Sequence, residues 1–274
     1  MADDEIPRLE MSDMTLLDET QIKEVVRERY GALARESATA TADDCCATDC
    51  CGSDGEDDVV ATFYDATSTD GLPAEALAAS AGCGNPHAIG TLQPGETVVD
   101  FGSGGGIDCF IAAKAVGETG RVIGIDMTED MIDLARSNAS KLGLGYVEFH
   151  LAEMEDTPLD NDSTDAIISN CVINLVPDKD LVFAEAFRIL RPGGRLMVSD
   201  LVRVAEIPQE EAEDTDNWVS CLAGTEMKDV YLGRIRDAGF TDIQIVSDTP
   251  WKSQVDWRAG IHSMNIKAFK PAAN

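Results

Sequence analysis

The sequence predicts an α/β fold built on a doubly wound sheet, because apolar segments alternate with helical ones from residue 97 onward. The candidate strands are 97–101, 121–126, 147–151, 165–170 and 195–201, and the candidate helices between them are 107–116, 129–142 and 179–190. Thr128 can cap the second helix, and Gly117 and Gly143 suit helix ends. The strand–helix–strand order implies parallel strands joined by right-handed crossovers.

Two regions flank this core, which we place at residues 76–202. Residues 1–75 contain a helix, which Asp18 and Gln21 predict by capping-box spacing, and then a polar, acidic loop over 37–58 that we expect to be mobile. Residues 203–274 contain helical stretches at 209–223 and 226–238 and strands at 242–247 and 265–269. We expect this small α+β region to complete the sheet and to lie on the substrate side.

The charge of the chain limits its partners. Asp and Glu number 51 against 21 Lys and Arg, a formal net charge of -30, which repels nucleic acid and anionic membranes. The acidic residues are spread along the chain, which indicates a solvated surface of the kind a halophile uses; an acidic partner-binding face is the alternative. No segment approaches the roughly 18–20 apolar residues of a membrane span, and the acidic start lacks the apolar core of a secretory signal.

We therefore expect a cytoplasmic protein. Eight cysteines in that compartment indicate metal binding or redox chemistry more than a static disulfide framework.

A glycine-rich turn follows the first candidate strand and reads D-x-G-x-G-x-G from Asp100 to Gly106. The dinucleotide fingerprint G-x-G-x-x-G fails because its last position is Ile107, and no Gly-Lys-Ser/Thr closes a P-loop. The turn resembles the first motif of the Rossmann-like S-adenosylmethionine-dependent methyltransferases. Within that resemblance, Asp126 at the end of the second strand suits a ribose diol, and Glu153 after the third strand suits an adenine edge.

The predicted cofactor site has further members. They are Asp100, Gly102, Ser103, Gly104, Met127 and Asn170. A nicotinamide or flavin enzyme and a non-catalytic α/β domain are the alternatives.

Cys171 comes directly after the fourth strand, so it lies at the same crevice as the glycine turn. Its surroundings resemble the arsenite S-adenosylmethionine methyltransferases, from about Val25 to Phe240. The matching segments are Gly-Cys-Gly-Asn-Pro at 82–86, the glycine turn at 100–108, residues 123–128, Ile-Ile-Ser-Asn-Cys-Val-Ile-Asn-Leu at 167–175, residues 177–179 and 185–188, and Trp218 followed by Cys-Leu-Ala-Gly at 221–224.

The resemblance implies roles for the cysteines. Cys171 and Cys221 match the pair that holds trivalent arsenic, a soft centre that prefers thiolates, and Cys83 matches a third cysteine that binds arsenic or enters a disulfide. In the family an N-terminal cysteine forms that disulfide, and Cys45 or Cys46 is the best candidate here, beside Cys50 and Cys51. The implied reaction is stepwise methylation of arsenite, or of its thiol conjugates, with a thioredoxin-like or small-thiol reductant restoring the thiols.

Other interpretations remain open. Cys109 lies inside a helix and suits packing, and the four N-terminal cysteines can bind zinc or pass arsenite inward. A methyltransferase for a small carbon or oxygen acceptor would need a base near the methyl group. A metalloid-binding protein without catalysis would have no use for the cofactor turn. The histidines, His87, His150 and His262, form no obvious constellation and suit packing or surface positions.

Overall fold

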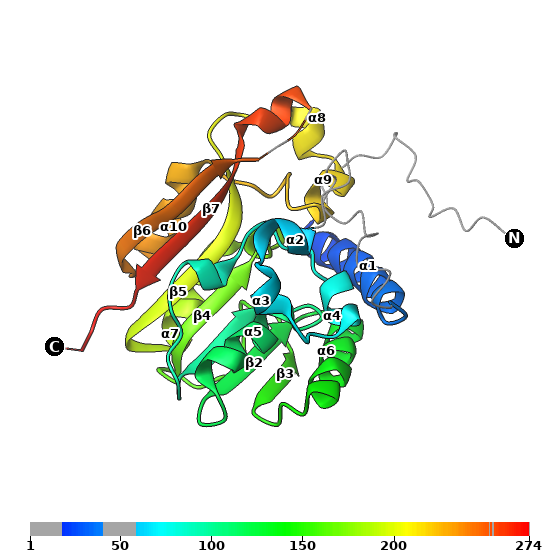
Figure 1. Cartoon of the computed structure of the whole chain (residues 1–274). Coiled ribbons are helices and arrows are strands. Elements are labelled where there is room, and N and C mark those ends of the chain that lie inside the picture. The colour runs from blue at the N-terminus through cyan, green and yellow to red at the C-terminus, as the bar shows by residue number, and fades with distance from the viewer. Residues whose placement is uncertain (1–17, 41–58, 252, 254, 274) are drawn as a thin grey trace, which may run out of the picture.

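The computed structural model describes residues 18–40, 59–251, 253 and 255–273. Its centre is a seven-stranded sheet in the order β3-β2-β1-β4-β5-β7-β6 (Figure 1). The strands are β1 (Thr97–Phe101), β2 (Arg121–Asp126), β3 (Val147–Leu151), β4 (Thr164–Asn170), β5 (Leu190–Arg203), β6 (Thr241–Pro250) and β7 (Ile261–Phe269). The longer helices are α1 (Glu19–Ser37), α5 (Ile107–Val116), α6 (Glu129–Leu142), α7 (Lys179–Ile189) and α10 (Lys228–Asp237).

The doubly wound sheet predicted from the sequence is confirmed. Strands β3, β2, β1, β4 and β5 pair in parallel, whereas β7 runs antiparallel to both β5 and β6. The predicted bounds of β1, β2 and β3 agree with the structure, and the two C-terminal strands join the same sheet as expected. The sheet is therefore mixed, with a parallel part that carries the glycine turn and an antiparallel edge.

The two faces of the sheet are buried by different helices, because successive residues of a strand point to opposite faces. Val99 of β1 packs in the cluster that contains Phe183 of α7 and Tyr231 of α10. Its neighbour Val98 packs in the cluster that contains Phe110 of α5 and Ile132 of α6. This three-layer arrangement leaves the carboxyl ends of the parallel strands free for a binding site.

The first helix begins as the sequence predicts. The Asp18 carboxylate accepts from the Gln21 backbone N–H at 2.9 Å, and the Gln21 side chain accepts from the Asp18 N–H at 2.9 Å, which completes the capping box. The four cysteines between residues 41 and 58 lie outside the described residues. No described helix is long and apolar enough to cross a membrane.

The helical stretch predicted over 209–223 is helical only in part and is divided in the structure. The structure has two short helices instead, α8 (Gln209–Ala212) and α9 (Thr215–Val219), because the Asp214 carboxylate accepts from the N–H groups of Asp216 and Asn217 and starts a new helix. Thr128 stands at the N-cap of α6 but makes no capping hydrogen bond with its side chain. Gly117 and Gly143 end α5 and α6, as predicted.

The net charge of -30 generates a prediction about stability. We expect the thermal unfolding midpoint to rise by on the order of 10 °C as KCl increases from 0.1 to 1 M, because screening relieves repulsion among the acidic side chains. The rise should level off above about 1 M, where the Debye length has fallen to about 3 Å. Differential scanning calorimetry measures it, with sucrose as an uncharged control. A midpoint that is the same at 0.1 and 1 M KCl would contradict the interpretation.

Candidate active site

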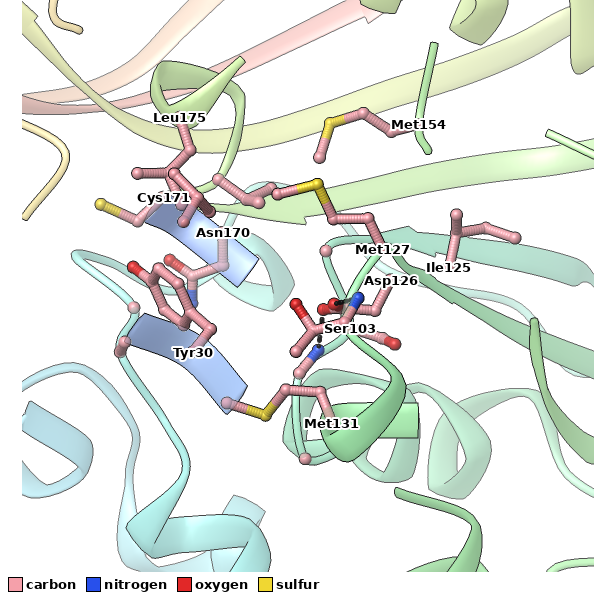
Figure 2. Close-up of a pocket in the computed structure, with 18 of the residues that line it drawn as sticks. Tyr30, Ser103, Ile125, Asp126, Met127, Met131, Met154, Asn170, Cys171 and Leu175 are labelled. Carbon is pink, nitrogen blue, oxygen red and sulfur yellow. Dashed lines mark hydrogen bonds between the residues drawn. The ribbon is translucent and has the colours of Figure 1, made fainter. Parts of the chain in front are cut away.

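A cavity opens at the carboxyl ends of β1, β2 and β4. Residues from the turns after these strands form its floor, and Lys23, Val26 and Tyr30 of α1 line its other side (Figure 2). Of the sequence-predicted cofactor residues, those that line the cavity are Gly102, Ser103, Gly104, Asp126, Met127 and Asn170.

The glycine turn after β1 needs its glycines. Gly102 and Gly104 have φ of 70° and 49°, in the left-handed region that favours glycine. A Cβ at Gly102 would also collide with the side chain of Val172. The N–H groups of Gly102 and Ser103 both donate to the Ile125 carbonyl, at 2.8 and 3.0 Å. These bonds hold the turn of β1 against the end of β2.

Asp126 lies where the sequence predicts, at the end of β2 and in the cavity wall. Burial raises the pKa of its carboxyl, and the N–H groups of Thr128 and Gly104, each 2.9 Å from a carboxylate oxygen, favour the charged form. Each oxygen keeps further acceptor capacity. The carboxylate is therefore oriented by the backbone and able to accept hydrogen bonds from a diol.

Two predicted cofactor residues do not line the cavity. The Asp100 side chain lies deeper, where it accepts from the Cys109 thiol at 3.3 Å, and burial together with the Asp108 carboxylate raises its pKa well above the usual range. Glu153 instead pairs with Lys23 at 2.5 Å and with Arg27 at 2.6 Å. These pairs lower the pKa of Glu153 and fasten α1 beside the cavity.

The residues on either side of Glu153 line the cavity in its place. They are Ala152, Met154 and Glu155.

A polar network surrounds the predicted residue Asn170, and it includes Tyr64, which the sequence did not reveal. Asn170 donates from Nδ2 to the Tyr64 hydroxyl at 2.8 Å and to the Gly84 carbonyl at 3.0 Å, and the Tyr64 hydroxyl donates to Asp108 at 2.8 Å. The Asn170 Oδ1 is buried and has no hydrogen-bond partner among the described residues. An unpartnered acceptor in such a cavity fits a ligand with N–H or O–H donors, as S-adenosylmethionine has.

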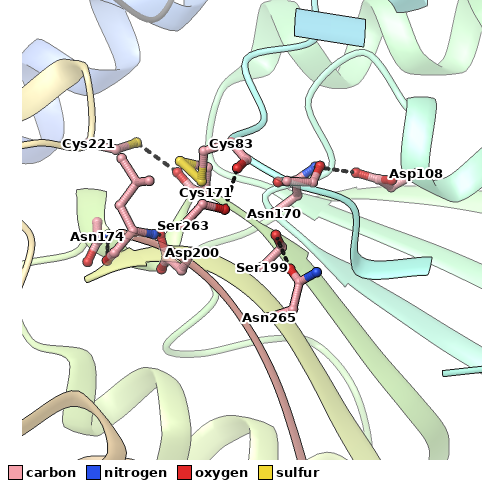
Figure 3. The surroundings of a disulfide bond; sticks show 12 residues. Cys83, Asp108, Asn170, Cys171, Asn174, Ser199, Asp200, Cys221, Ser263 and Asn265 are labelled. Carbon is pink, nitrogen blue, oxygen red and sulfur yellow. Dashed lines mark hydrogen bonds between the residues drawn. A yellow bond between two sulfur atoms is a disulfide. The ribbon is translucent and has the colours of Figure 1, made fainter. Parts of the chain in front are cut away.

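The three predicted thiol ligands come together beside this cavity (Figure 3). Cys83 and Cys171 form a disulfide with a Cα–Cα distance of 5.5 Å, although 88 positions separate them in the sequence. The Cys221 thiol donates to the Cys171 carbonyl at 2.7 Å. All three are buried, with exposures of 0, 4 and 2%. The family-derived expectation paired Cys83 with Cys45 or Cys46; here its partner is Cys171, and both N-terminal candidates lie outside the described residues.

Both arsenic-ligand candidates occupy strained backbone positions. Cys171 has φ of 60° and Cys221 has φ of 63°, and among the described non-glycine residues only Asp162 and Asp242 share this sign. A left-handed conformation costs roughly 1–2 kcal/mol for a residue with a Cβ. Backbone hydrogen bonds hold each cysteine in this conformation: the Cys171 N–H donates to the Ser199 carbonyl, and the Cys221 N–H donates to the Trp218 carbonyl. Such strain gathers at functional sites.

A buried carboxylate lies beside the disulfide. One Asp200 oxygen is within 4.8 Å of both sulfurs. The carboxylate accepts from Asn174 Nδ2 at 2.8 Å and from the Tyr231 hydroxyl at 2.9 Å, and burial raises its pKa to about 7. The sequence analysis did not identify Asp200. The one feature that could have indicated it is its position in β5, the strand that pairs with β4.

Apolar side chains surround the thiols on the other side. The buried cysteines share a cluster with Leu175, Leu201 and Ile261, and partly buried Trp218, Trp251 and Trp257 pack against it. Such surroundings exclude water from the sulfurs, which strengthens electrostatic interactions there.

The glycine turn generates a prediction with a matched control. Gly102→Ala should weaken binding of S-adenosylhomocysteine at least roughly tenfold, about 1.4 kcal/mol, because the new methyl group displaces Val172. Gly143→Ala has nearly the same φ of 68° but open space around its Cβ, so it should carry the backbone strain without the loss of affinity. Isothermal titration calorimetry compares the two variants. Equal affinities would show that the contact with Val172 does not shape the site.

Comparison with known proteins agrees with this geometry. A family model described as a methyltransferase domain matches residues 92–252. The arsenite methyltransferase of Halobacterium salinarum is 38% identical over 93% of this chain and 68% of its own length. The human arsenite methyltransferase is 38% identical, over 46% of this chain and 36% of its own.

A solved structure extends the likeness to the fold. The crystal structure of an arsenic(III) S-adenosylmethionine methyltransferase from Chlamydomonas reinhardtii superimposes with a TM-score of 0.67 at 33% identity, covering 76% of this chain and 73% of that one. The identity and coverage of the Halobacterium relative, together with this fold, decide the assignment. The chain belongs to the arsenite methyltransferase family.

Proposed function

We propose that this protein methylates arsenite stepwise, with S-adenosylmethionine as methyl donor and with Cys171 and Cys221 as the thiolates that hold trivalent arsenic. Cys83 serves as a third ligand and as a redox partner. The observation that carries the proposal is the meeting of these cysteines, from separate parts of the chain, beside a cavity lined by the glycine turn and Asp126.

The residues of the cavity fit the cofactor in kind. Asp126 is able to accept from a diol, and Asn170 presents an acceptor without a partner among the described residues. Met127, Met131 and Met154 supply an apolar wall. When bound, S-adenosylmethionine supplies a methyl group on a positively charged sulfur. The role of the chain is then to orient this group toward the thiols and to exclude water.

The cysteines determine what the arsenic can do. Bound to two or three thiolates, trivalent arsenic keeps a lone pair, which forms the new bond to the methyl carbon as the carbon–sulfur bond breaks. Arsenic loses two electrons formally in this transfer. Two thiolates that join as a disulfide release two electrons, which restores the trivalent state, and the bond between Cys83 and Cys171 is such an oxidised pair.

The disulfide must be reduced between cycles. Its sulfurs belong to residues that are almost fully buried, and thiol–disulfide exchange requires an attacking thiolate to reach one of them. A thioredoxin-like or small-thiol reductant in the cytoplasm completes the cycle. Cys45 or Cys46 would then act as the relay that transfers electrons to the buried pair.

Two other functions explain the cysteines and the cofactor turn less well than arsenite methylation does. A carbon or oxygen methyltransferase needs a base beside the methyl group, whereas the end of β4 presents Cys171. A metalloid buffer needs no cofactor turn. Incubation with arsenite, a thiol and labelled S-adenosylmethionine separates the three, since only the proposed enzyme places the label on arsenic.

Substitution of the thiols gives the first test of the site. Cys171→Ser and Cys221→Ser should each abolish formation of methylated arsenic, because a hydroxyl is a poor ligand for a soft centre. Affinity for S-adenosylhomocysteine should be unchanged. Cys109→Ser is the matched control: this buried thiol bonds to Asp100 away from the cavity, and serine keeps the hydrogen bond. Normal methylation by Cys171→Ser would overturn the ligand assignment.

The relay is tested separately by replacing the four N-terminal cysteines together with serine. The first turnover should proceed at the normal rate, because it uses thiols already reduced, whereas the steady-state rate with a thiol reductant should fall. Rapid-quench measurement of methylated arsenic distinguishes the two phases. An unchanged steady-state rate would remove the N-terminal cysteines from the cycle.

A further inference from the structure

Cys83, Cys171 and Asp200 offer a set of donor atoms that the methylation chemistry does not use as a set. The two sulfurs and one carboxylate oxygen all lie within 4.8 Å of one another, and all three residues are buried. The Cys221 sulfur is not part of this group. This set and the proposed arsenic site therefore share the thiols of Cys83 and Cys171. The third ligand is Asp200 in this set and Cys221 in the arsenic site.

The donor set has the chemistry of a thiophilic divalent cation. Zinc is bound in proteins by thiolate sulfur at about 2.3 Å and carboxylate oxygen at about 2.0–2.2 Å. Two sulfurs in a tetrahedral zinc site lie about 3.8 Å apart by these bond lengths. The Cα–Cα distance of 5.5 Å between Cys83 and Cys171 is compatible with this separation of the sulfurs once the disulfide opens.

The Asp200 carboxylate is already supported as a ligand would be. Oδ1 accepts from Asn174 at 2.8 Å and from the Leu201 N–H at 2.9 Å, and Oδ2 accepts from the Tyr231 hydroxyl at 2.9 Å. With two lone pairs on each oxygen, one on Oδ2 is left for a cation. Partners of this kind orient ligating carboxylates in metal sites.

Charge also favours a cation here. Two thiolates and a carboxylate carry more negative charge than a divalent ion neutralises. The buried Lys179 ammonium lies close enough to Asp200 and Cys221 to act on both electrostatically, and it offsets the excess. A cation at this position also pairs the buried carboxylate, which burial alone would penalise.

We propose that in the reduced protein Cys83, Cys171 and Asp200 bind a divalent cation of the zinc class, which competes with trivalent arsenic for the two thiols. Binding releases the two thiol protons, and oxidation to the disulfide excludes the cation because no thiolate remains. Only the competition rests on the proposed function; the binding itself does not.

Cobalt(II) binding to the reduced full-length chain tests the site, because thiolate ligation to cobalt gives a near-ultraviolet charge-transfer band. A phosphine reductant opens the disulfide: phosphine and water become phosphine oxide, and the two sulfurs become thiols. The measurement is made in a background where Cys45, Cys46, Cys50 and Cys51 are serine. We expect one cobalt per chain, displaced by zinc, and Cys109→Ser should keep the band.

Two variants separate the cation from arsenic. Asp200→Asn keeps the size of the side chain but should weaken zinc binding at least roughly tenfold, with a much smaller effect on arsenite binding. Cys221→Ser should keep the cobalt band and lose tight arsenite binding. Absence of the band, or a band unaffected by Asp200→Asn, would overturn the proposal. Arsenite methylation by Cys221→Ser would instead overturn the proposed ligand set and leave the cation site standing.

Discussion

The contact between Gly102 and Val172 is the constraint on which the site depends. Strands β1 and β4 are hydrogen-bonded neighbours, with Phe101 opposite Ser169, so the residues that follow them leave the sheet side by side. A side chain at position 102 has no room because Val172 fills the space. The turn for the cofactor and the segment that carries Cys171 are thereby fixed against each other, which is what an in-line transfer between two bound groups requires.

Cys221 is joined to this pair by a second close approach. A Cβ at Gly224 would collide with the Asn174 carbonyl, so the segment after α9 packs directly on the segment after β4. The Tyr30 hydroxyl of α1 donates to the Val219 carbonyl at 3.2 Å, which links the helix beside the cavity to the segment that leads to Cys221. The wall of the cavity that α1 forms and the three cysteines are therefore packed together. Displacement of α1 would disturb both.

The sequence predicted the helices and strands for which apolar pattern, capping residues and turn residues indicate the same structure. It missed the features that contacts between distant segments determine. Strands such as β4 carry a short apolar run, here residues 166–168, of the kind found in a sheet that is buried on both faces. The predicted helix over 209–223 is broken because the side chain of Asp214 provides a competing local start. Glu153, predicted from its position after β3, pairs with Lys23 and Arg27 and does not line the cavity. Asp200 and Tyr64 were missed because a buried polar residue is recognisable only once its partners are known, and these come from distant segments.

The charge of the cavity favours a positively charged ligand over a neutral one. Asp108, Asp126 and Glu155 line it, and the pairing of Lys23 with both Glu153 and Glu155 neutralises only part of this charge. A sulfonium ion beside these carboxylates is attracted, and the attraction survives high salt better than surface pairs do because the groups are partly buried. Methyl transfer removes the positive charge from the sulfur. The same carboxylates then hold the neutral thioether product less tightly, so the chemical step itself weakens the interaction that brought the cofactor in.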